Sequence, residues 1–346
     1  MTRVNRAGGA SVRGEGSVPS IRDVARAAGV SHMTVSRVLN AHPNVSAATR
    51  ERVEAVIAEL RFRPSRTARA LAHGASRVIG VVEATGGRYY GPASTIAAIE
   101  DAARAEGFSV MIAAIDEGST GSGAAAVEHL LDQGAAGLIL VGPGATASGE
   151  VTDAAAGVPL VVMHAAEGAG SSSAEQVEGG RVAARHLLEL GHRTMAQLAG
   201  PAGWVEAEAR ARGFAAELAE AGVTLAAQVE GDWTAASGFA AGRELLAVGG
   251  FTAVFCANDQ MALGMLHAAR VAGIAVPAEL SVIGFDDMPE AAHYAPALTT
   301  LRQDFGELGR RAIATLLAQL GRGAAPGPVS APKLIVRESA ARAPRG

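Results

Sequence analysis

The fold of the N-terminal part is decided by one stretch, SIRDVARAAGVSHMTVSRVLN, which spans residues 20–40. Ser20 is a typical helix cap, and Asp23 is placed to bond back to the backbone of that cap. Gly29 is expected to end this first helix, and Ser31 is expected to cap a second one. Two short helices joined by a glycine turn predict a helix-turn-helix, whose second helix has the size of a DNA major groove.

A small apolar core follows from the spacing of the aliphatic residues. A third helix is predicted from a cap at Ser46 to Leu60, and it closes this core. The apolar positions of the three helices are Val24, Ala25, Ala28, Val35, Val38, Leu39, Val53, Val56, Ile57 and Leu60. Val35, Val38 and Leu39 are expected to be core residues whatever the module binds.

Side chains on the outer face of the second helix are the candidates for contacting DNA. They are Ser31, His32, Met33, Thr34, Ser36, Arg37 and Asn40. Arg37 can fork onto O6 and N7 of a guanine. Ser31, Thr34 and Asn40 suit phosphate contacts, although Ser31 also suits a purely capping role. On an isolated helix this face would be solvated, but the cap, the turn and the third helix favour base recognition.

The charge of the chain changes sign along its length. Residues 1–77 hold 13 Arg, no Lys and 5 acidic residues, a net charge of +8, whereas the remainder carries −12. Lys333 is the one lysine, so a general preference for arginine explains the residue type but not the change of sign. A basic N-terminal segment followed by an acidic remainder is typical of a protein whose N-terminal module binds a polyanion.

From Arg77 onward, short apolar runs alternate with amphipathic stretches. Strands are predicted over residues 78–82, 109–115, 137–141, 160–163, 195–198, 228–230, 253–256 and 281–284. Helices are predicted over residues 92–106, 123–133, 178–190, 206–221, 235–248 and 259–272. The alternation predicts parallel sheets covered on both faces, and its two series predict two lobes with a ligand cleft between their strand ends.

Several classes of protein are disfavoured. Cys256 is the one cysteine, lies in an apolar run, and is expected to be a buried hydrophobic residue rather than half of a disulfide. The first 19 residues lack the apolar core of a secretory signal, and no apolar run has the length of a membrane span. We therefore expect no membrane association and a cytoplasmic location.

No catalytic, metal or cofactor site is expected. The histidines His164, His186, His192, His267 and His293 show no metal-ligand spacing, and His186 and His192 are expected at the surface. Residues 142–147 match G-x-G-x-x-A after a strand, but Pro143 and the small polar residues that follow favour a plain loop over a nucleotide site. An enzyme on a doubly wound core stays an alternative by analogy of fold alone.

A resemblance to a known family covers nearly the whole chain, from about residue 20 to residue 337. The segments that carry it are IRDVA (21–25), AGVS (28–31), TVSRVLN (34–40), EGDW (230–233), ANDQMALG (257–264), SVIGFDD (281–287) and LTTLRQDF (298–305). They resemble segments of the LacI/GalR family of bacterial transcriptional regulators. The resemblance implies an N-terminal all-α helix-turn-helix DNA-binding domain and an α/β two-lobed periplasmic-binding-protein-like core.

The resemblance also implies the domain organisation. The parts expected are a flexible tail (1–19), a helix-turn-helix domain (20–63), a hinge helix (64–76) and an effector-binding core (77–340). Within the core, one lobe is expected to consist of residues 77–175 and 303–331, and the other of residues 176–302 and 332–340. The chain is thereby implied to cross between the lobes three times. In relatives the hinge helix orders on DNA and inserts a leucine into the minor groove, and Leu71 matches that leucine.

Effector contacts are implied residue by residue. Arg210, Trp233, Asn258, Asp286, Gln303 and Phe305 match effector-contacting positions of the family, and His164 stands near a further such position. An aspartate that accepts hydroxyl protons, donors from Arg and Asn, and an indole on an apolar sugar face suit a sugar. Each residue alone also suits a structural role. His164, Glu206 and Glu208 depart from the family pattern and leave the identity of the sugar open.

The sequence thus predicts a DNA-binding transcriptional regulator, specifically a repressor released by a small galactoside-like sugar. A purine- or nucleoside-responsive regulator of the same architecture is the main alternative. The DNA partner is expected to be a double-stranded, pseudo-palindromic operator. A homodimer is expected because one helix-turn-helix makes few base contacts, and its paired surface is expected near residues 92–106 and 259–272.

Overall fold

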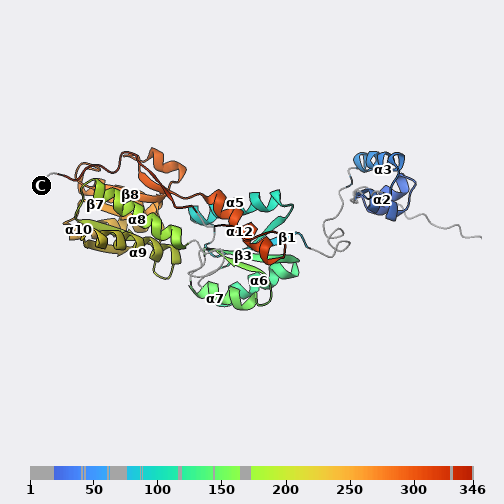
Figure 1. The fold of residues 1–346 in the computed structure, drawn as a ribbon, viewed down its shortest axis with the longest axis horizontal. Coiled ribbons are helices and arrows are strands. Elements are labelled where there is room, and N and C mark those ends of the chain that lie inside the picture. Colours follow the sequence, from blue (N-terminus) through green and yellow to red (C-terminus); the bar gives the residue numbers. More distant parts are fainter. Residues whose placement is uncertain are drawn as a thin grey trace, which may run out of the picture. The chain divides into compact units, whose positions relative to one another are not determined.

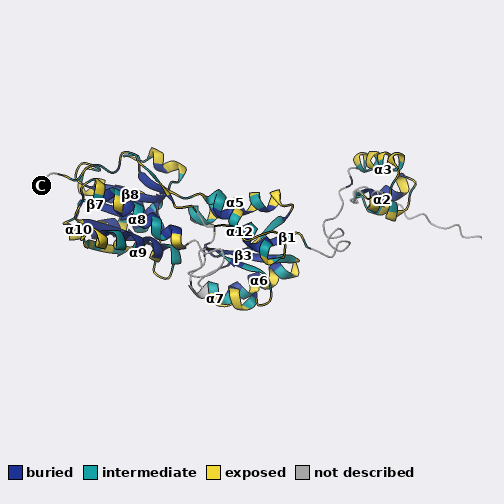
Figure 2. Cartoon of the chain, viewed as in Figure 1, coloured by how far each residue is buried: buried dark blue, intermediate teal, exposed yellow. Residues whose placement is uncertain are grey.

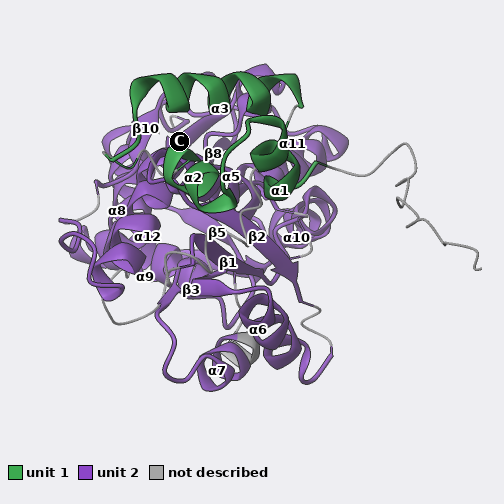
Figure 3. Cartoon of the chain, turned by 90° about the vertical axis from the view of Figure 1, so that its right-hand side faces the viewer, with its two compact units in different colours: residues 1–75 green, residues 76–346 purple. Residues whose placement is uncertain are grey.

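The structure is a computed structural model of the full chain. It describes residues 19–39, 42, 44–60, 62, 76–85, 87, 89–115, 119–142, 145–163, 173–327 and 330–344. Three predicted site residues, Asn40, Leu71 and His164, lie outside the described residues, as does the predicted hinge helix except for Ser76. The chain divides into two compact units, Met1–Ala75 and Ser76–Gly346 (Figure 3).

The first unit contains three helices, α1 (Ile21–Ala27), α2 (His32–Leu39) and α3 (Ala47–Glu59). The predicted capping box at the start of α1 is confirmed. The backbone N–H of Asp23 donates to Oγ of Ser20 over 3.4 Å, and the backbone N–H of Ser20 donates to Oδ2 of Asp23 over 3.0 Å. Two N–H groups at this helix end therefore have partners without help from the rest of the chain.

The core of the first unit buries six of the ten predicted positions together with Phe62, and the other four, Leu39, Val56, Ile57 and Leu60, are partly buried against it. Its buried members are Val24, Ala25, Ala28, Val35, Val38, Val53 and Phe62. Gly29 turns the chain between α1 and α2 with φ +62°, a conformation in which most side chains are strained. This core fixes the angle between the two helices and leaves the outer face of α2 exposed.

The second unit begins with a four-stranded parallel sheet. Its strands are β1 (Val78–Glu83), β2 (Ser109–Ala114), β3 (Ala135–Val141) and β4 (Leu160–Val162), in the order β2-β1-β3-β4. Its helices are α5 (Tyr90–Ala105) and α12 (Phe305–Gln319) on one face, and α6 (Ser122–Asp132) and α7 (Ala145–Ala154) on the other. Side chains of β1 alternate accordingly, because Ile79 and Val81 pack with α5 and α12 while Val82 packs with α6.

A six-stranded sheet forms the other lobe (Figure 1). Its strands are β5 (Met195–Ala199), β6 (Leu225–Glu230), β7 (Ala253–Cys256), β8 (Ser281–Asp286), β9 (Thr299–Arg302) and β10 (Lys333–Ile335), in the order β10-β9-β8-β7-β5-β6. One face packs against α8 (Ser173–Glu189) and α9 (Val205–Glu220), and the other against α10 (Ala235–Val248) and α11 (Asp259–Ala272). The central strands β5, β7 and β8 are buried between these helices, whose outer faces are exposed (Figure 2). The predicted parallel sheets are confirmed, with β10 as the antiparallel exception.

The chain passes between the two lobes at three places. The first lies between β4 and α8, and the second lies between β9 and α12, because α12 packs against α5 of the first sheet. The third follows α12 and leads to β10, which pairs with β9. A short 3-10 helix, Pro289–His293, follows β8.

Two expectations about this unit are wrong, and one is confirmed. The loop predicted over 142–147 is wrong from Ala145 onward, where α7 begins, because burial of Val151 against α6 stabilises a helix of weak helix formers. His192 is buried rather than at the surface, and its ring bonds Thr252 and Ser281. Cys256 is fully buried, as predicted.

Across the residues that the structure describes, no helix combines the length and the apolar character that a bilayer crossing requires.

Candidate effector pocket and DNA-binding helix

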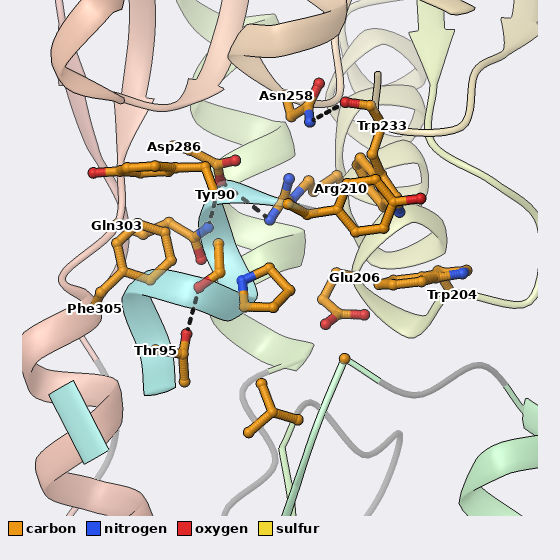
Figure 4. Close-up of a pocket in the computed structure, with 15 residues that line it drawn as sticks. Tyr90, Thr95, Trp204, Glu206, Arg210, Trp233, Asn258, Asp286, Gln303 and Phe305 are labelled. Atoms are coloured by element: carbon orange, nitrogen blue, oxygen red, sulfur yellow. Dashed lines mark hydrogen bonds and ion pairs between the residues drawn. The ribbon is translucent and has the colours of Figure 1, made fainter. Parts of the chain in front are cut away.

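A pocket in the second unit is lined by residues from both lobes (Figure 4). It holds about 540 Å³ of unoccupied space, which includes the solvent at its opening. The first lobe contributes Tyr90, Pro92 and Thr95 from α5 and Val141 from the end of β3, and the second contributes Glu206 and Arg210 from α9 and Asp286 from the end of β8. The pocket thus lies at the carboxyl ends of parallel strands, where the sequence predicts a ligand cleft.

All six described residues that the sequence assigns to the effector lie around this one pocket. They are Arg210, Trp233, Asn258, Asp286, Gln303 and Phe305. They come from six separate places along the chain, namely α9, the β6–α10 loop, the N-terminus of α11, the end of β8, the β9–α12 crossing and the start of α12. The fold brings them together, and their role toward an effector remains a proposal.

Four polar side chains at the pocket form a closed ring of contacts. Nε of Arg210 donates to Oε1 of Gln176 over 2.7 Å, and Nε2 of Gln176 donates to Oε1 of Gln303 over 2.6 Å. Nε2 of Gln303 then donates to Oδ1 of Asp286 over 2.7 Å, and this same oxygen lies 3.6 Å from Nη2 of Arg210. The charged residues fix the direction of the ring, because arginine only donates and a carboxylate only accepts.

Burial shifts the pKa values of the two charged residues in this ring. Burial raises the pKa of Asp286 to about 6, although the nearby Arg210 guanidinium and the Gln303 amide act to lower it. Burial likewise lowers the pKa of Arg210, against the attraction of Asp286. The Arg210 guanidinium is further held by the carbonyl of Ala257 and lies 3.8 Å from the ring centroid of Phe285. The pocket therefore presents one carboxylate that titrates near neutral pH beside a fixed cation.

Backbone strain is concentrated at this pocket. Among the described non-glycine residues, only Trp233 (φ +74°), Asp286 (φ +106°) and Asp287 (φ +54°) have positive φ. Two of these three line the pocket, and the third follows directly. Such conformations cost about 1–3 kcal/mol each and collect at functional sites, where surrounding contacts hold them.

Contacts from neighbouring residues hold this strained segment in place. Asp287 accepts from Nε of Arg302 and from Nη2 of Arg337, each over 2.6 Å. The carboxylate of Asp259 is buried behind the pocket, and it accepts from Thr300 over 2.5 Å and from the backbone N–H of Met288 over 2.9 Å. These bonds fix the direction in which the Asp286 side chain enters the pocket.

Asn258 combines its position in the pocket with a structural role. Its Oδ1 accepts from the backbone N–H of Met261 over 2.8 Å and so caps α11, and its Nδ2 donates to the carbonyl of Trp233 over 3.0 Å. One Nδ2 hydrogen is left over for a ligand. The structure thus supports the alternative structural role of Asn258 without removing it from the pocket.

Two groups of aromatic rings line the pocket, on opposite sides in Figure 4. Tyr89, Trp204 and Trp233 follow one another edge to face, with centroid separations of 6.0 Å and 5.7 Å. Phe305 packs edge to face with Tyr90 at 5.6 Å. Both tryptophans of the chain line this pocket. Such rings offer apolar faces to a sugar ring or a base.

Three aromatic residues that line the pocket, and Gln176 in the ring of contacts beside it, were not predicted from the sequence. Trp204 and the pair Tyr89 and Tyr90 were signalled by the scarcity of aromatic residues in the chain, 4% of the total, and by their positions after strands. Gln176 had no such signal, because a glutamine in the first turn of an amphipathic helix is usually solvent-exposed. Its buried contacts become visible only when α8 is placed against α9.

The predicted DNA-contacting residues are presented on α2 of the first unit. His32, Met33 and Arg37 are exposed, with 60% of the Met33 surface accessible although the side chain is apolar. Ser31 caps α2, since its Oγ accepts from the backbone N–H of Thr34 over 3.0 Å. Ser36 is half-buried. On this exposed face, the cationic side chain of Arg37 and the apolar side chain of Met33 therefore lie outside the unit's own core.

Comparisons with known proteins agree with both units. Residues 20–65 match the model of bacterial regulatory proteins of the lacI family, and residues 184–340 match a periplasmic binding protein-like domain. The chain is 38% identical to the lactose operon repressor of Escherichia coli K12, a match that covers 88% of this chain and 86% of that one. It is also 34% identical to the transcriptional repressor PurR of Erwinia tasmaniensis, over 87% of this chain and 90% of that one.

Solved structures that resemble this chain also belong to transcriptional regulators. The lac repressor dimer bound to operator and the anti-inducer ONPF superposes with a TM-score of 0.84 at 34% identity, covering 94% of this chain and all of that one. The complex of the transcriptional regulator CelR with cellobiose has a TM-score of 0.66 at 29% identity, covering 93% and 99%. The predicted fold class is confirmed. The chain belongs to the lacI family of bacterial regulatory proteins, and it is a DNA-binding transcriptional regulator rather than an enzyme.

Proposed function

We propose that the protein is a homodimeric repressor in the cytoplasm, where its DNA lies, and that a small sugar in the pocket releases it from its operator. The observation that supports the sugar is the placement of Asp286 and Arg210 beside the indole of Trp233. A carboxylate accepts two hydroxyl protons, a guanidinium donates to hydroxyl oxygens, and an indole covers the apolar face of a pyranose. The galactoside-like class proposed from the sequence fits this set.

A purine or nucleoside is the second candidate. The edge-to-face run of Tyr89, Trp204 and Trp233 offers flat apolar surfaces to a base, and the PurR repressors are among the relatives. Asp286 and Gln303 also suit the donors and acceptors of a base edge. The presence of two indoles beside a buried ion pair favours the sugar, because a sugar needs both an apolar platform and paired hydroxyl partners.

We propose that α2 contacts the operator in the major groove through His32, Met33, Ser36 and Arg37, with Ser31, Thr34 and Asn40 on or near the phosphates. Leu71 is proposed as the minor-groove wedge of a hinge helix, although the residue lies outside the described part of the chain. The boundaries of tail, DNA-binding domain, hinge and core stay as the sequence predicts them. This arrangement puts base recognition and effector binding on separate units of the chain.

The proposed homodimer rests on the solved lac repressor dimer and on the apolar exposure of α11. Leu263 and Val271 are 40% and 60% exposed on this helix, which is one of the two segments expected at the paired surface. Pairing buries such side chains and places two copies of α2 on the two halves of a pseudo-palindrome.

The test is calorimetric titration of the full chain with a panel of monosaccharides, galactosides and disaccharides, and with purine bases and nucleosides. We expect binding by a sugar in the panel, lost in Asp286→Ala and retained in Asp153→Ala, an exposed control on α7. Binding by purines without any sugar assigns the site to the second candidate. Equal sugar affinity in Asp286→Ala and wild type contradicts the site.

A further inference from the structure

The ring of side chains at the pocket contains one member whose role the proposed effector contacts do not explain. Gln176 is fully buried in the first turn of α8 and does not line the pocket, yet both ends of its amide are used. Its oxygen accepts from Arg210 and its nitrogen donates to Gln303. It therefore connects the cation of the pocket to the residue that holds Asp286.

The contacts of Gln176 explain an unusual feature of the Arg210–Asp286 pair. Nη2 of Arg210 lies 3.6 Å from Oδ1 of Asp286, whereas a charge-assisted N–H···O bond is about 2.7–2.9 Å long. Both side chains are more than nine-tenths buried, so attraction between them is little screened. Gln176 and the carbonyl of Ala257 hold the guanidinium from one side, and Gln303 holds the carboxylate from the other.

We propose that Gln176 is a positioning residue that keeps Arg210 and Asp286 apart, so that a ligand hydroxyl can enter between them. The proposal rests on the proposed function for the identity of the ligand, but not for the geometry of the pair. Close packing of two helices holds Gln176 in place. A Cβ on Gly180 of α8 would lie 2.2 Å from the backbone oxygen of Arg210, and one on Gly213 of α9 would lie 1.9 Å from that of Val177.

Gln176 also connects two of the three passages between the lobes. It belongs to the first turn of the helix that follows the β4–α8 passage, and its partner Gln303 lies in the β9–α12 passage. A ligand that takes over the carboxylate of Asp286 removes the acceptor of Gln303 and so loosens its bond to Gln176. Through this bond, occupancy of the pocket acts on both passages.

Two substitutions at this position are expected to move the pair in opposite directions. Gln176→Leu removes the acceptor of Nε of Arg210, so the guanidinium closes onto Asp286. Gln176→Glu draws the guanidinium toward the new carboxylate, and it also turns the Gln303 amide so that its oxygen faces Asp286. The matched control is Gln197→Leu in β5, because Gln197 is equally buried and its amide atoms have no hydrogen-bond partner among the described residues.

Crystal structures of the ligand-free full-length variants decide the proposal. The Nη2–Oδ1 distance is expected to shorten from 3.6 Å to about 2.8 Å in Gln176→Leu and to lengthen in Gln176→Glu, and to stay unchanged in Gln197→Leu. An unchanged distance in both Gln176 variants overturns the proposal. This measurement needs no ligand, so it stands apart from any failure to find a sugar.

A solution measurement adds a readout that loss of packing alone does not move. Both tryptophans line the pocket, so tryptophan emission follows the titration of Asp286. Asp286 interacts electrostatically with four other charged or titratable groups, namely Arg210 and Glu206 of α9, Asp259 of α11 and Tyr90 of α5. The emission midpoint is expected near pH 6 in wild type and Gln197→Leu, lower in Gln176→Leu and higher in Gln176→Glu, with no transition in Asp286→Asn. Coinciding midpoints in the two Gln176 variants contradict the proposal.

Affinity for methyl β-galactoside completes the test. We expect Gln176→Leu to bind this probe about tenfold more weakly than Gln197→Leu, because the probe must then separate a closed ion pair. Equal affinities contradict the positioning role. If wild type binds no sugar but the distances move as stated, the proposed function fails and the role of Gln176 stands.

Discussion

Arg210 and Asp286 face each other across 3.6 Å inside a pocket that both lobes line, and both side chains are buried. Burial raises the pKa of the carboxyl to about 6, so the charge of the pocket changes just below neutral pH. A buried ion pair of this kind is weak evidence for stability, because desolvation opposes the attraction. Its place in the pocket is the basis of the binding role proposed for it.

Effector affinity is therefore expected to depend on pH. Protonation of Asp286 removes an acceptor for hydroxyl groups and for Gln303, so affinity falls as the pH drops through about 6. The loss between pH 7.5 and pH 5 is about tenfold for one proton. Calorimetry across this range measures it. Asp286→Asn is the control and is expected to bind weakly at every pH, whereas an affinity independent of pH in wild type contradicts the role of the carboxylate.

Arg37 is expected to determine one base of the operator. Its side chain is exposed on α2 and lies clear of the buried core. Arg37→Ala should cost about 1–3 kcal/mol of binding free energy and relax the preference at one position of each half-site. The matched control is Arg243→Ala, an exposed arginine on α10 of the second unit. Binding to randomised operators measures both, and a loss that is uniform over all sequences would show a phosphate contact instead.

Asn258 is expected to contribute to stability as well as to binding. Asn258→Ala removes the cap of α11 and leaves the carbonyl of Trp233 without its bond, at a cost of about 1–2 kcal/mol. Asn258→Ser keeps a capping oxygen and should recover part of that loss. Urea unfolding followed by tryptophan emission separates the two variants. Identical stabilities for alanine, serine and wild type would show that the capping bond contributes nothing.

His192 is expected to make the second unit sensitive to acid. Burial lowers its pKa, and the neutral ring bonds Thr252, Ser281 and the carbonyl of Ala341. The unfolded chain binds a proton more readily than the folded one, so the stability from this residue is full above about pH 6.5 and is lost as the pH falls below it. Melting temperatures of wild type and His192→Gln should converge on acidification. A constant difference from pH 7.5 to pH 5 contradicts this account.

Features controlled by local sequence were predictable. The capping box at Ser20, the turn at Gly29 and the buried faces of α1 and α2 depend on neighbouring residues, so the sequence signals them directly. Helices α10 and α11 begin and end where the amphipathic pattern places them. The strands β9 and β10 were not predicted, since four and three residues give too short a pattern and their pairing joins distant segments.

Features controlled by tertiary packing were not predictable in the same way. α7 was missed because its Thr, Ser and Gly residues disfavour a helix locally, and only packing against α6 selects one. His192 was misplaced because a polar residue after a helix end is usually exposed, whereas here three partners enclose it. The resemblance to a family supplied the six pocket residues, but Gln176 needed the packed structure of α8 against α9.

The most direct test of the central claim joins the two units in one measurement. Fluorescence anisotropy of an operator fragment, selected from genomic DNA by the protein itself, is followed while a sugar panel is added to wild type and to Asp286→Ala. We predict that one sugar weakens operator binding by wild type at least tenfold, and that Asp286→Ala binds the same operator equally well but does not respond. If no sugar changes operator binding by wild type, or if Asp286→Ala still responds, the account is contradicted.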